Sequence, residues 1–207
     1  MASYSSQKYF LNYVMVSIIA FYSSTLSAKN KSADTPLPNP KVLQQLLKDK
    51  IFVKTSIESN QNHQKQQILD YYIAGLHPAS CPKALRKLSL YQHFKDYFSH
   101  ITQSLYNEKN KEIFIRLDHP VLPHPFTLNF QLPRITKEGS YPFIFKKGIF
   151  NNLQGWIYVS TYTNRCLFQT QANWTGKHTG YPDTLIEIFS DTLSRIAMEK
   201  LFRATQF

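Results

Sequence analysis

The chain has 207 residues, with 24 Lys and Arg against 13 Asp and Glu, and a formal net charge of +11. Hydrophobic residues make up 43% and charged residues 18%, so the chain can bury a real core and global disorder is excluded. Its two cysteines exclude a disulfide-dense miniprotein and a four-thiolate zinc site, and its six glycines exclude a collagen-like repeat. The length favours one domain with a short extension.

The first 28 residues are typical of a signal peptide. They carry one charge, Lys8, and the run 9–22 is almost entirely apolar, with small residues after it. The alternative is an uncleaved membrane anchor, although the run falls short of the roughly 20 residues that a spanning helix needs. We therefore expect a periplasmic or secreted protein, which makes nucleic acid an improbable partner. An oxidising compartment would also allow Cys81 and Cys166 to form a disulfide.

The next part of the chain contains a tether, a helix and a hairpin. Residues 29–40 are polar with three prolines and are expected to form an extended tether. Apolar spacing in 41–50 predicts a short amphipathic helix. The alternating and β-branched stretches 51–58 and 67–76 predict two strands, and the polar residues between them predict a hairpin connection.

Ser80 and Pro82 mark the start of a helix that runs to about Leu90, followed by a short turn near 92–98. After it, turn-like separators and short apolar runs predict an antiparallel meander. Its expected strands are 99–107, 111–118, 125–132, 141–147, 153–161 and 165–174. We expect Pro133 and Pro142 at strand ends, where no backbone donor is required.

A long amphipathic helix is predicted from Pro182 to Ala204. Its apolar stripe includes Leu185, Phe189 and Leu193, and Asp191 is expected on the solvent face, as is Glu187. The element order is therefore strand, helices, about six antiparallel strands and a terminal helix. This order predicts an α+β fold in which one helix lies across the concave face of a curved sheet.

This arrangement resembles the START-like helix-grip superfamily, which includes START lipid-transfer domains, polyketide cyclase-like proteins, coenzyme-Q-binding proteins and the birch-pollen allergen fold. The resemblance covers about 66–204. It is carried by the opening ILDYYIAGL strand, the ASCPKALRKL helix and the aromatic element LYQHFKDY, which contains Leu90, Tyr91, Phe94 and Tyr97. The closing hairpin and terminal helix also match. By this resemblance, 41–207 is a START-like domain with an additional N-terminal helix and strand.

The resemblance implies a cavity between the sheet and the C-terminal helix that holds an apolar molecule such as a lipid or isoprenoid, without covalent chemistry. The expected lining residues are Phe126, Phe130, Phe143, Phe145, Trp156, Tyr158, Phe168, Leu185, Phe189 and Leu193. The many aromatic residues in predicted strands support this independently. Ordinary core packing of these side chains remains open. A cyclase- or hydrolase-like enzyme and a cavity-less interaction module are the alternative functions.

A disulfide between Cys81 and Cys166 is geometrically reasonable. In a helix-grip sheet the first core strand and the last strand are antiparallel neighbours, so the end of one lies near the start of the other. Two separate buried thiols are the alternative. No histidine is suitably placed beside either cysteine, so we predict no catalytic nucleophile.

The remaining polar features suggest surface binding rather than catalysis. Lys177 and His178 precede the terminal helix, where a lipid phosphate could bind, and an exposed turn is the alternative. The basic excess, including Lys83, Arg86 and Lys87 on one short helix, favours an anionic membrane surface or serves solubility alone. Asp118, His119 and His124 form only a weak metal pattern. We predict no catalytic residues, no metal and no cofactor.

Overall fold

The computed structural model describes residues 36–60, 66–118, 125–148 and 150–206, apart from the side chains of Asn60 and Phe126. The predicted signal segment 1–28 and residues 29–35 of the predicted tether lie outside these residues, and the tether's last residue, Pro40, begins α1. The described elements are α1 (Pro40–Leu46), β1 (Phe52–Asn60), β2 (Gln66–His77), α2 (Cys81–Leu88), η1 (Tyr91–His93), α3 (Phe94–Tyr97), β3 (Ile101–Asn107), β4 (Glu112–Leu117), β5 (Phe126–Gln131), β6 (Gly139–Lys147), β7 (Gln154–Tyr162), β8 (Arg165–Lys177) and α4 (Asp183–Ala204).

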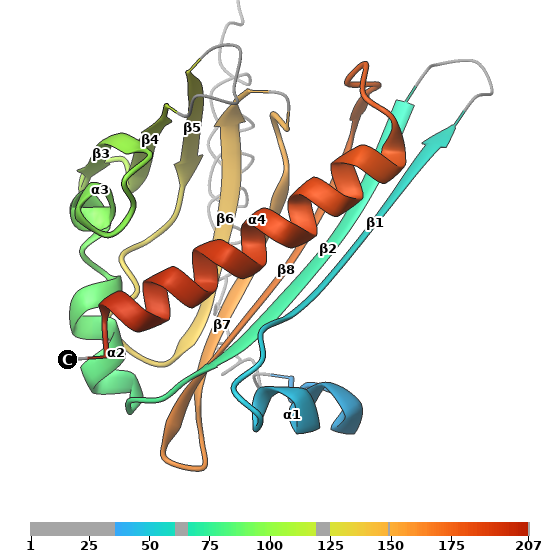
Figure 1. Ribbon diagram of the computed structural model, residues 1–207. Helices are drawn as coiled ribbons and strands as arrows, with labels where there is room; N and C mark the ends of the chain where they lie inside the picture. Colours follow the sequence, from blue (N-terminus) through green and yellow to red (C-terminus); the bar gives the residue numbers. More distant parts are fainter. Residues whose placement is uncertain (1–35, 61–65, 119–124, 149, 207) are drawn as a thin grey trace, which may run out of the picture. The chain divides into compact units, whose positions relative to one another are not determined.

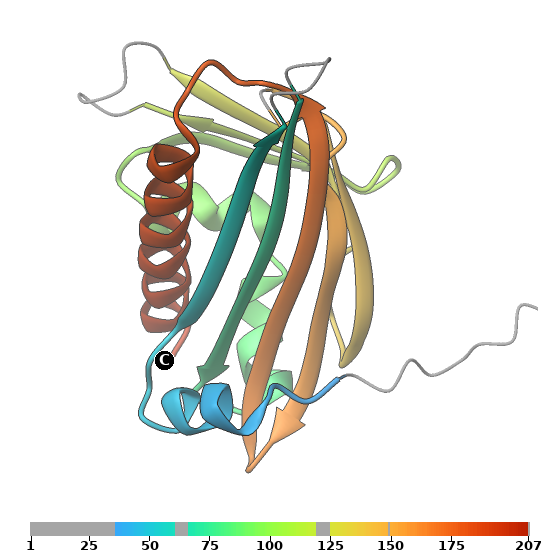
Figure 2. The same ribbon diagram turned by 90° about the vertical axis from the view of Figure 1, so that its right-hand side faces the viewer.

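The strands form one antiparallel sheet of eight strands in the order β1-β2-β8-β7-β6-β5-β4-β3. Strands β3 to β8 are the meander predicted from the turn spacing, and β2 pairs with β8 along its whole length. The sheet curves, and α4 runs diagonally along its inner face (Figures 1 and 2). The α+β prediction and its element order are confirmed.

Local sequence signals explain where the first two helices begin. The side chain of Asn39 accepts a hydrogen bond of 2.9 Å from the backbone N–H of Val42, which caps α1 ahead of its first residue, Pro40. Ser80 precedes α2 and Pro82 occupies its first turn, where a missing N–H costs nothing. None of the described helices is long and apolar enough to cross a bilayer.

Two apolar clusters hold the sheet. The larger one lies on the inner face and includes Leu69, Ile73, Val159 and Phe202. The smaller one lies on the outer face, where Val42 and Leu46 of α1 pack on Ala74, Leu76 and Leu167. The helix–strand extension therefore completes the sheet edge and covers one end of its outer face.

The position of Pro142 differs from the prediction. It lies inside β6 and pairs in register with Trp156 of β7, rather than at a strand end. The neighbouring strand β5 contacts β6 only from Ile144 to Lys147. Because the other edge of β6 has no partner strand at Pro142, the missing backbone donor costs no ladder hydrogen bond.

Candidate ligand-binding site

The strand register decides which predicted residues face α4. Phe168 of β8 lies on the inner face and its ring centroid is 5.6 Å from that of Phe202 in α4. Phe143 and Phe145 of β6 lie on the same face, because β6 pairs in register with inner-facing positions of β7. The rings of Phe130 and Phe145 stack with centroids 5.1 Å apart. Four of the predicted lining residues therefore share the inner face, and the side chain of Phe126 lies outside the described set.

Trp156 and Tyr158 lie on the opposite, outer face, so the prediction that they line the inner cavity is wrong. Trp156 pairs with Gln171, and Ile157 pairs with Thr170 on the inner side. Successive side chains of a strand point to opposite faces, so β7 contributes Gly155, Ile157 and Val159 to the inner surface instead. The composition of β7 could not reveal this, because both faces carry large apolar residues.

Helix α4 meets the sheet through carboxylates. Asp183 accepts hydrogen bonds from the backbone N–H of Ser59 at 3.0 Å and from its hydroxyl at 2.7 Å. One turn later, Glu187 accepts a hydrogen bond of 2.8 Å from the backbone N–H of Ile57. The backbone groups on the free edge of β1 thus receive partners from a helix rather than from another strand.

The same contact continues toward the C-terminus of α4. The Thr55 hydroxyl donates to Asp191 at 2.5 Å, and the guanidinium of Arg195 donates to the carbonyl of Ile51 at 2.7 Å. The prediction that Asp191 and Glu187 lie on the solvent face is therefore wrong. The edge strand needs acceptors for its backbone N–H groups, and Asp183 and Glu187, four residues apart on α4, supply them, while Asp191 binds the Thr55 hydroxyl.

As a result, the apolar stripe of α4 does not pack on the sheet. Leu185, Phe189 and Leu193 are each about half exposed, as are Ile188 and Ile196. Leu185, Phe189 and Leu193 are not buried against the sheet, because the opposite face of α4 is fastened to β1. Their role as ligand-lining residues stays a prediction.

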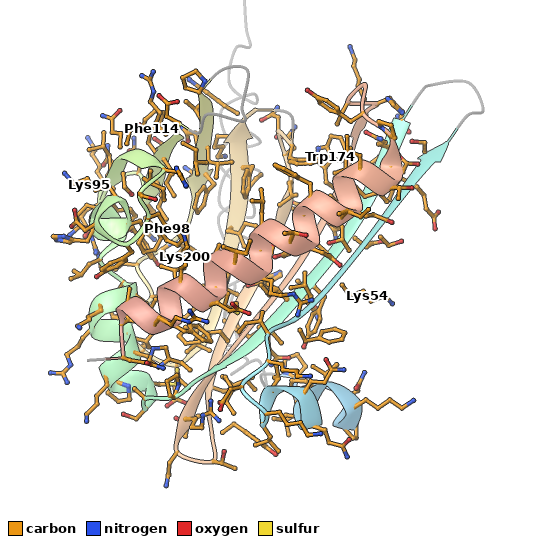
Figure 3. All side chains as sticks on the ribbon, in the orientation of Figure 1. Lys54, Lys95, Phe98, Phe114, Trp174 and Lys200 are labelled. Atoms are coloured by element: carbon orange, nitrogen blue, oxygen red, sulfur yellow. A yellow bond between two sulfur atoms is a disulfide. The ribbon has the colours of Figure 1, made fainter. Side chains whose placement is uncertain are left out.

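An apolar surface remains between α4 and the middle of the sheet. Leu128, Phe130, Phe145 and Ile157 are only partly buried on the inner face. Ile186 of α4 is buried among the same cluster, and Leu193 follows it by seven residues, on nearly the same side of the helix. Trp174 closes one end, where its indole packs edge-on against Phe150 at 5.3 Å (Figure 3).

The predicted disulfide is confirmed. Cys81 begins α2, Cys166 lies at the start of β8, and their sulfur atoms are bonded. The backbone N–H of Cys166 also donates to the carbonyl of Ala79 at 3.0 Å. The bond ties the helix after β2 to the strand beside β2, as expected for antiparallel neighbours.

The proposed anion site has a carboxylate beside it. Lys177 ends β8, and His178 in the following turn accepts a hydrogen bond of 3.0 Å from the backbone N–H of Gly180. The side chain of Gln67, which sequence reasoning missed, organises this turn by bonding Thr179 and Asp183. Since Asp183 places a negative charge at the helix start, it opposes a bound phosphate, and the anion site stays a prediction.

His77 is buried and contacts residues at the C-terminal end of α4. His77 bonds Thr205 at 3.0 Å and packs edge-on against Phe202 at 5.0 Å. Burial lowers the pKa of His77, so the ring stays neutral at physiological pH. This contact fixes the C-terminal end of α4 to the sheet.

Metal ligands do not gather within the described residues: no group of three or more His, Cys, Asp or Glu side chains is arranged to hold an ion there. Two members of the weak pattern, His119 and His124, lie outside the described residues, so that pattern cannot be placed.

No family model matches the sequence, and no curated protein matches it. Solved structures do. The di-domain ARO/CYC StfQ from the steffimycin biosynthetic pathway matches with a TM-score of 0.54 and 9% identity, over 67% of this chain and 49% of StfQ. Ara h 8.0201 matches with a TM-score of 0.53 and 7% identity, over 67% of this chain and 97% of the other. An uncharacterised protein from Bacillus thuringiensis matches with a TM-score of 0.51 and 15% identity, over 67% and 99%.

The chain has a helix-grip fold. The matched part spans about half of the StfQ chain, and the identities are low enough that the likeness concerns the fold alone. In this helix-grip protein, the helix that gives the fold its name is fastened along one edge strand, and the inner aromatic surface lies on the strands beyond that edge.

Proposed function

We propose that this helix-grip protein binds a hydrophobic small molecule, of the lipid or isoprenoid class, between α4 and the inner face of β5–β7. It does so without covalent chemistry. One observation carries the proposal: the stacked pair Phe130 and Phe145 is only partly buried on a face where α4 packs chiefly along β1. Covering such partly buried aromatic surface with another apolar group is favourable, because it removes apolar area from water.

The position of α4 supports a site with one wall held in place by hydrogen bonds to β1. Polar contacts hold the Asp183–Arg195 half of α4 on β1, and Leu193 is on the side of the helix that Ile186 buries. An apolar ligand placed there would cover Leu193 and the aromatic pair together. The burial of apolar area would supply the binding energy, at about 25 cal/mol per Å².

We also propose that the protein is exported. The disulfide between Cys81 and Cys166 supports this, since such bonds persist in oxidising compartments. The apolar run in 9–22 would direct the chain there, cleaved or retained as an anchor. A positively charged surface would favour contact with an anionic membrane, from which a lipid ligand could be taken.

The test is native mass spectrometry with lipid extraction, on protein purified from an exporting host. We expect an apolar molecule that leaves on denaturation. Leu193→Gln should lower the occupancy, because it places an amide in the proposed site while keeping good helix propensity. Ile188→Gln is the matched control, since Ile188 is 61% exposed and lies about 200° round the helix from Ile186.

A protein that is empty, and that takes up no member of a panel of fatty acids, phospholipids and isoprenoids, would overturn the proposal in favour of an interaction module. If the Leu193 and Ile188 variants lost ligand equally, the binding site would not be on the Leu193 side of α4.

A further inference from the structure

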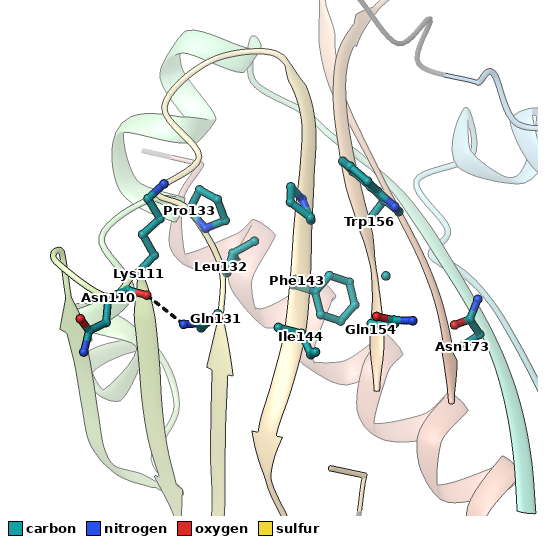
Figure 4. Close-up of a pocket in the computed structure, with 12 residues that line it drawn as sticks. Asn110, Lys111, Gln131, Leu132, Pro133, Phe143, Ile144, Gln154, Trp156 and Asn173 are labelled. Carbon is teal, nitrogen blue, oxygen red and sulfur yellow. Dashed lines mark hydrogen bonds between the residues drawn. The ribbon is translucent and has the colours of Figure 1, made fainter. Parts of the chain in front are cut away.

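A pocket of about 580 Å³ lies on the outer face of the sheet, away from α4 (Figure 4). It forms where β5 and β6 separate. Strand β6 continues through Pro142 without a β5 partner, while the chain after β5 turns aside at Leu132. The backbone N–H of Leu132 donates to the carbonyl of Lys111 at 2.8 Å, which holds that side of the opening.

The pocket has an aromatic platform. Trp156 lines it from β7 and is 46% exposed, whereas the other tryptophan, Trp174, is buried. The indole nitrogen of Trp174 donates to the carbonyl of Asn151, so that ring is fully engaged in the fold. Pro142, the register partner of Trp156 on β6, and Pro133, across the opening after β5, add flat apolar surface.

Side-chain amides surround this platform. Gln154 and Asn173 are register partners on β7 and β8, and both line the pocket beside Trp156 (Figure 4). Their side chains make no hydrogen bond to any part of the chain that the structure describes. Gln131 also lines the pocket, and its amide nitrogen donates to the carbonyl of Asn110 at 3.3 Å. Lys111 supplies the one charged side chain of the lining, which contains no acid.

We propose that this outer-face pocket binds a saccharide. A pyranose ring presents a face of polarised C–H groups, which suits the negative face of an exposed indole, and a rim of hydroxyls. Hydroxyls both donate and accept, and so do the side-chain amides of Gln154 and Asn173. The absence of acidic groups from the lining disfavours a cationic ligand, and the polar rim disfavours a purely apolar one.

This inference does not rest on the hydrophobic ligand proposed above, because Trp156, Gln154 and Asn173 lie on the outer face of the sheet, although Phe143 of the inner face also borders the pocket. Loss of one would leave the other intact, and each has its own variants.

The experiment titrates the mature protein with chitotetraose, cellotetraose and maltotetraose, and follows tryptophan fluorescence and the amide NMR spectrum. We expect one of them to shift the emission and the resonances of Gln154 and Asn173. Trp156→Ala should weaken that binding by about tenfold or more, as expected for loss of an aromatic stacking partner. Tyr158→Ala is the matched control, since Tyr158 is the next outer-face residue of β7 and does not line the pocket. It should change the affinity less than twofold.

The absence of any response to all three oligosaccharides at millimolar concentration overturns the proposal, as does binding that Trp156→Ala leaves unchanged. Thermal melting of both variants establishes that they are folded. A decaproline peptide is titrated in parallel, because an exposed tryptophan between prolines also suits an extended proline-rich chain. Binding of that peptide alone would reassign the pocket to a protein partner.

Discussion

Asp183 accepts hydrogen bonds from both the backbone N–H and the hydroxyl of Ser59, at 3.0 and 2.7 Å. These two residues lie 124 positions apart, at the start of α4 and near the end of β1. Gln67 adds a third donor to the same carboxylate at 2.7 Å. The start of the gripping helix is therefore held on the sheet by an ionised group.

This arrangement predicts an acid-sensitive helix contact. Hydrogen bonds from Ser59 and Gln67 hold the pKa of Asp183 below the ordinary value of 3.8. Because the folded pKa is the lower one, the stabilisation is fully present above pH 3.8. It is lost as the pH falls through the folded pKa. Urea unfolding followed by circular dichroism should show this acidic decline in the free energy of unfolding.

Asp183→Asn should be less stable at neutral pH and should flatten the decline, because the neutral amide does not titrate. Thr184→Asn, an exposed change one residue along, is the control. An unchanged pH slope in the Asp183 variant would assign the decline to other carboxylates.

The disulfide should contribute strongly to stability. It joins residues separated by 85 positions, and closing such a loop restricts the unfolded chain by about 4 kcal/mol in the chain-entropy model. Cys81→Ala with Cys166→Ala should therefore lower the melting temperature by about 8–16 °C for a domain of this size. Reductant should lower the melting temperature of the wild-type protein similarly and should not affect the double variant, which tests whether the bond forms.

Two glycines should tolerate a methyl group to very different degrees. A Cβ on Gly155 would lie 2.0 Å from the backbone carbonyl oxygen of Gln171, inside the β7–β8 ladder. A Cβ on Gly75 would meet the ends of flexible side chains instead, the nearest being Met198 at 2.5 Å. Gly75→Ala should cost about 1–3 kcal/mol by overpacking. Gly155→Ala should cost more, because a ladder carbonyl cannot move aside. Chemical denaturation of both variants measures the order, and equal costs would contradict it.

Tyr91 should stabilise the segment after β5, which contains Pro133 and Ile135. Its hydroxyl donates to the carbonyl of Pro133 at 3.0 Å and accepts from the backbone N–H of Ile135 at 3.1 Å. Tyr91→Phe removes both bonds and leaves two backbone groups without partners, at a cost of about 1–3 kcal/mol. Hydrogen exchange should show faster exchange at Ile135. Tyr141→Phe removes an exposed bond to Lys137 and should have a smaller effect.

Local sequence patterns predicted most of the fold. The alternation in 51–58 and the aromatic run after Gln66 indicated β1 and β2, and the turn spacing indicated the later meander. The pairing of Cys81 with Cys166 was also predictable, because it follows from two strands being antiparallel neighbours. Strand alternation and turn spacing depend on residues close together in the chain. The cysteine pairing depends on one rule, that the first core strand and the last strand of a helix-grip sheet are neighbours.

What the sequence could not determine was orientation. The repeat of Asp183, Glu187 and Asp191 is typical of a solvent face, and only the edge of β1 turns it into the contact face of α4. Likewise, Trp156 was assigned to the wrong face of β7, since both faces of that strand carry large residues.

The sequence by itself therefore determined the elements and their order, because periodicity and caps act over a few residues. The disulfide was predictable only through the resemblance to helix-grip sheets, which makes the strands beside the two cysteines neighbours. Only the tertiary structure decided which face of α4 meets the sheet. It also decided that Trp156 lies on the outer face of the sheet, away from α4. The first choice depends on backbone groups of β1 more than 100 residues away, whose need for hydrogen-bond partners outweighs the burial of an apolar stripe. The second depends on the register of β7 with β6 and β8.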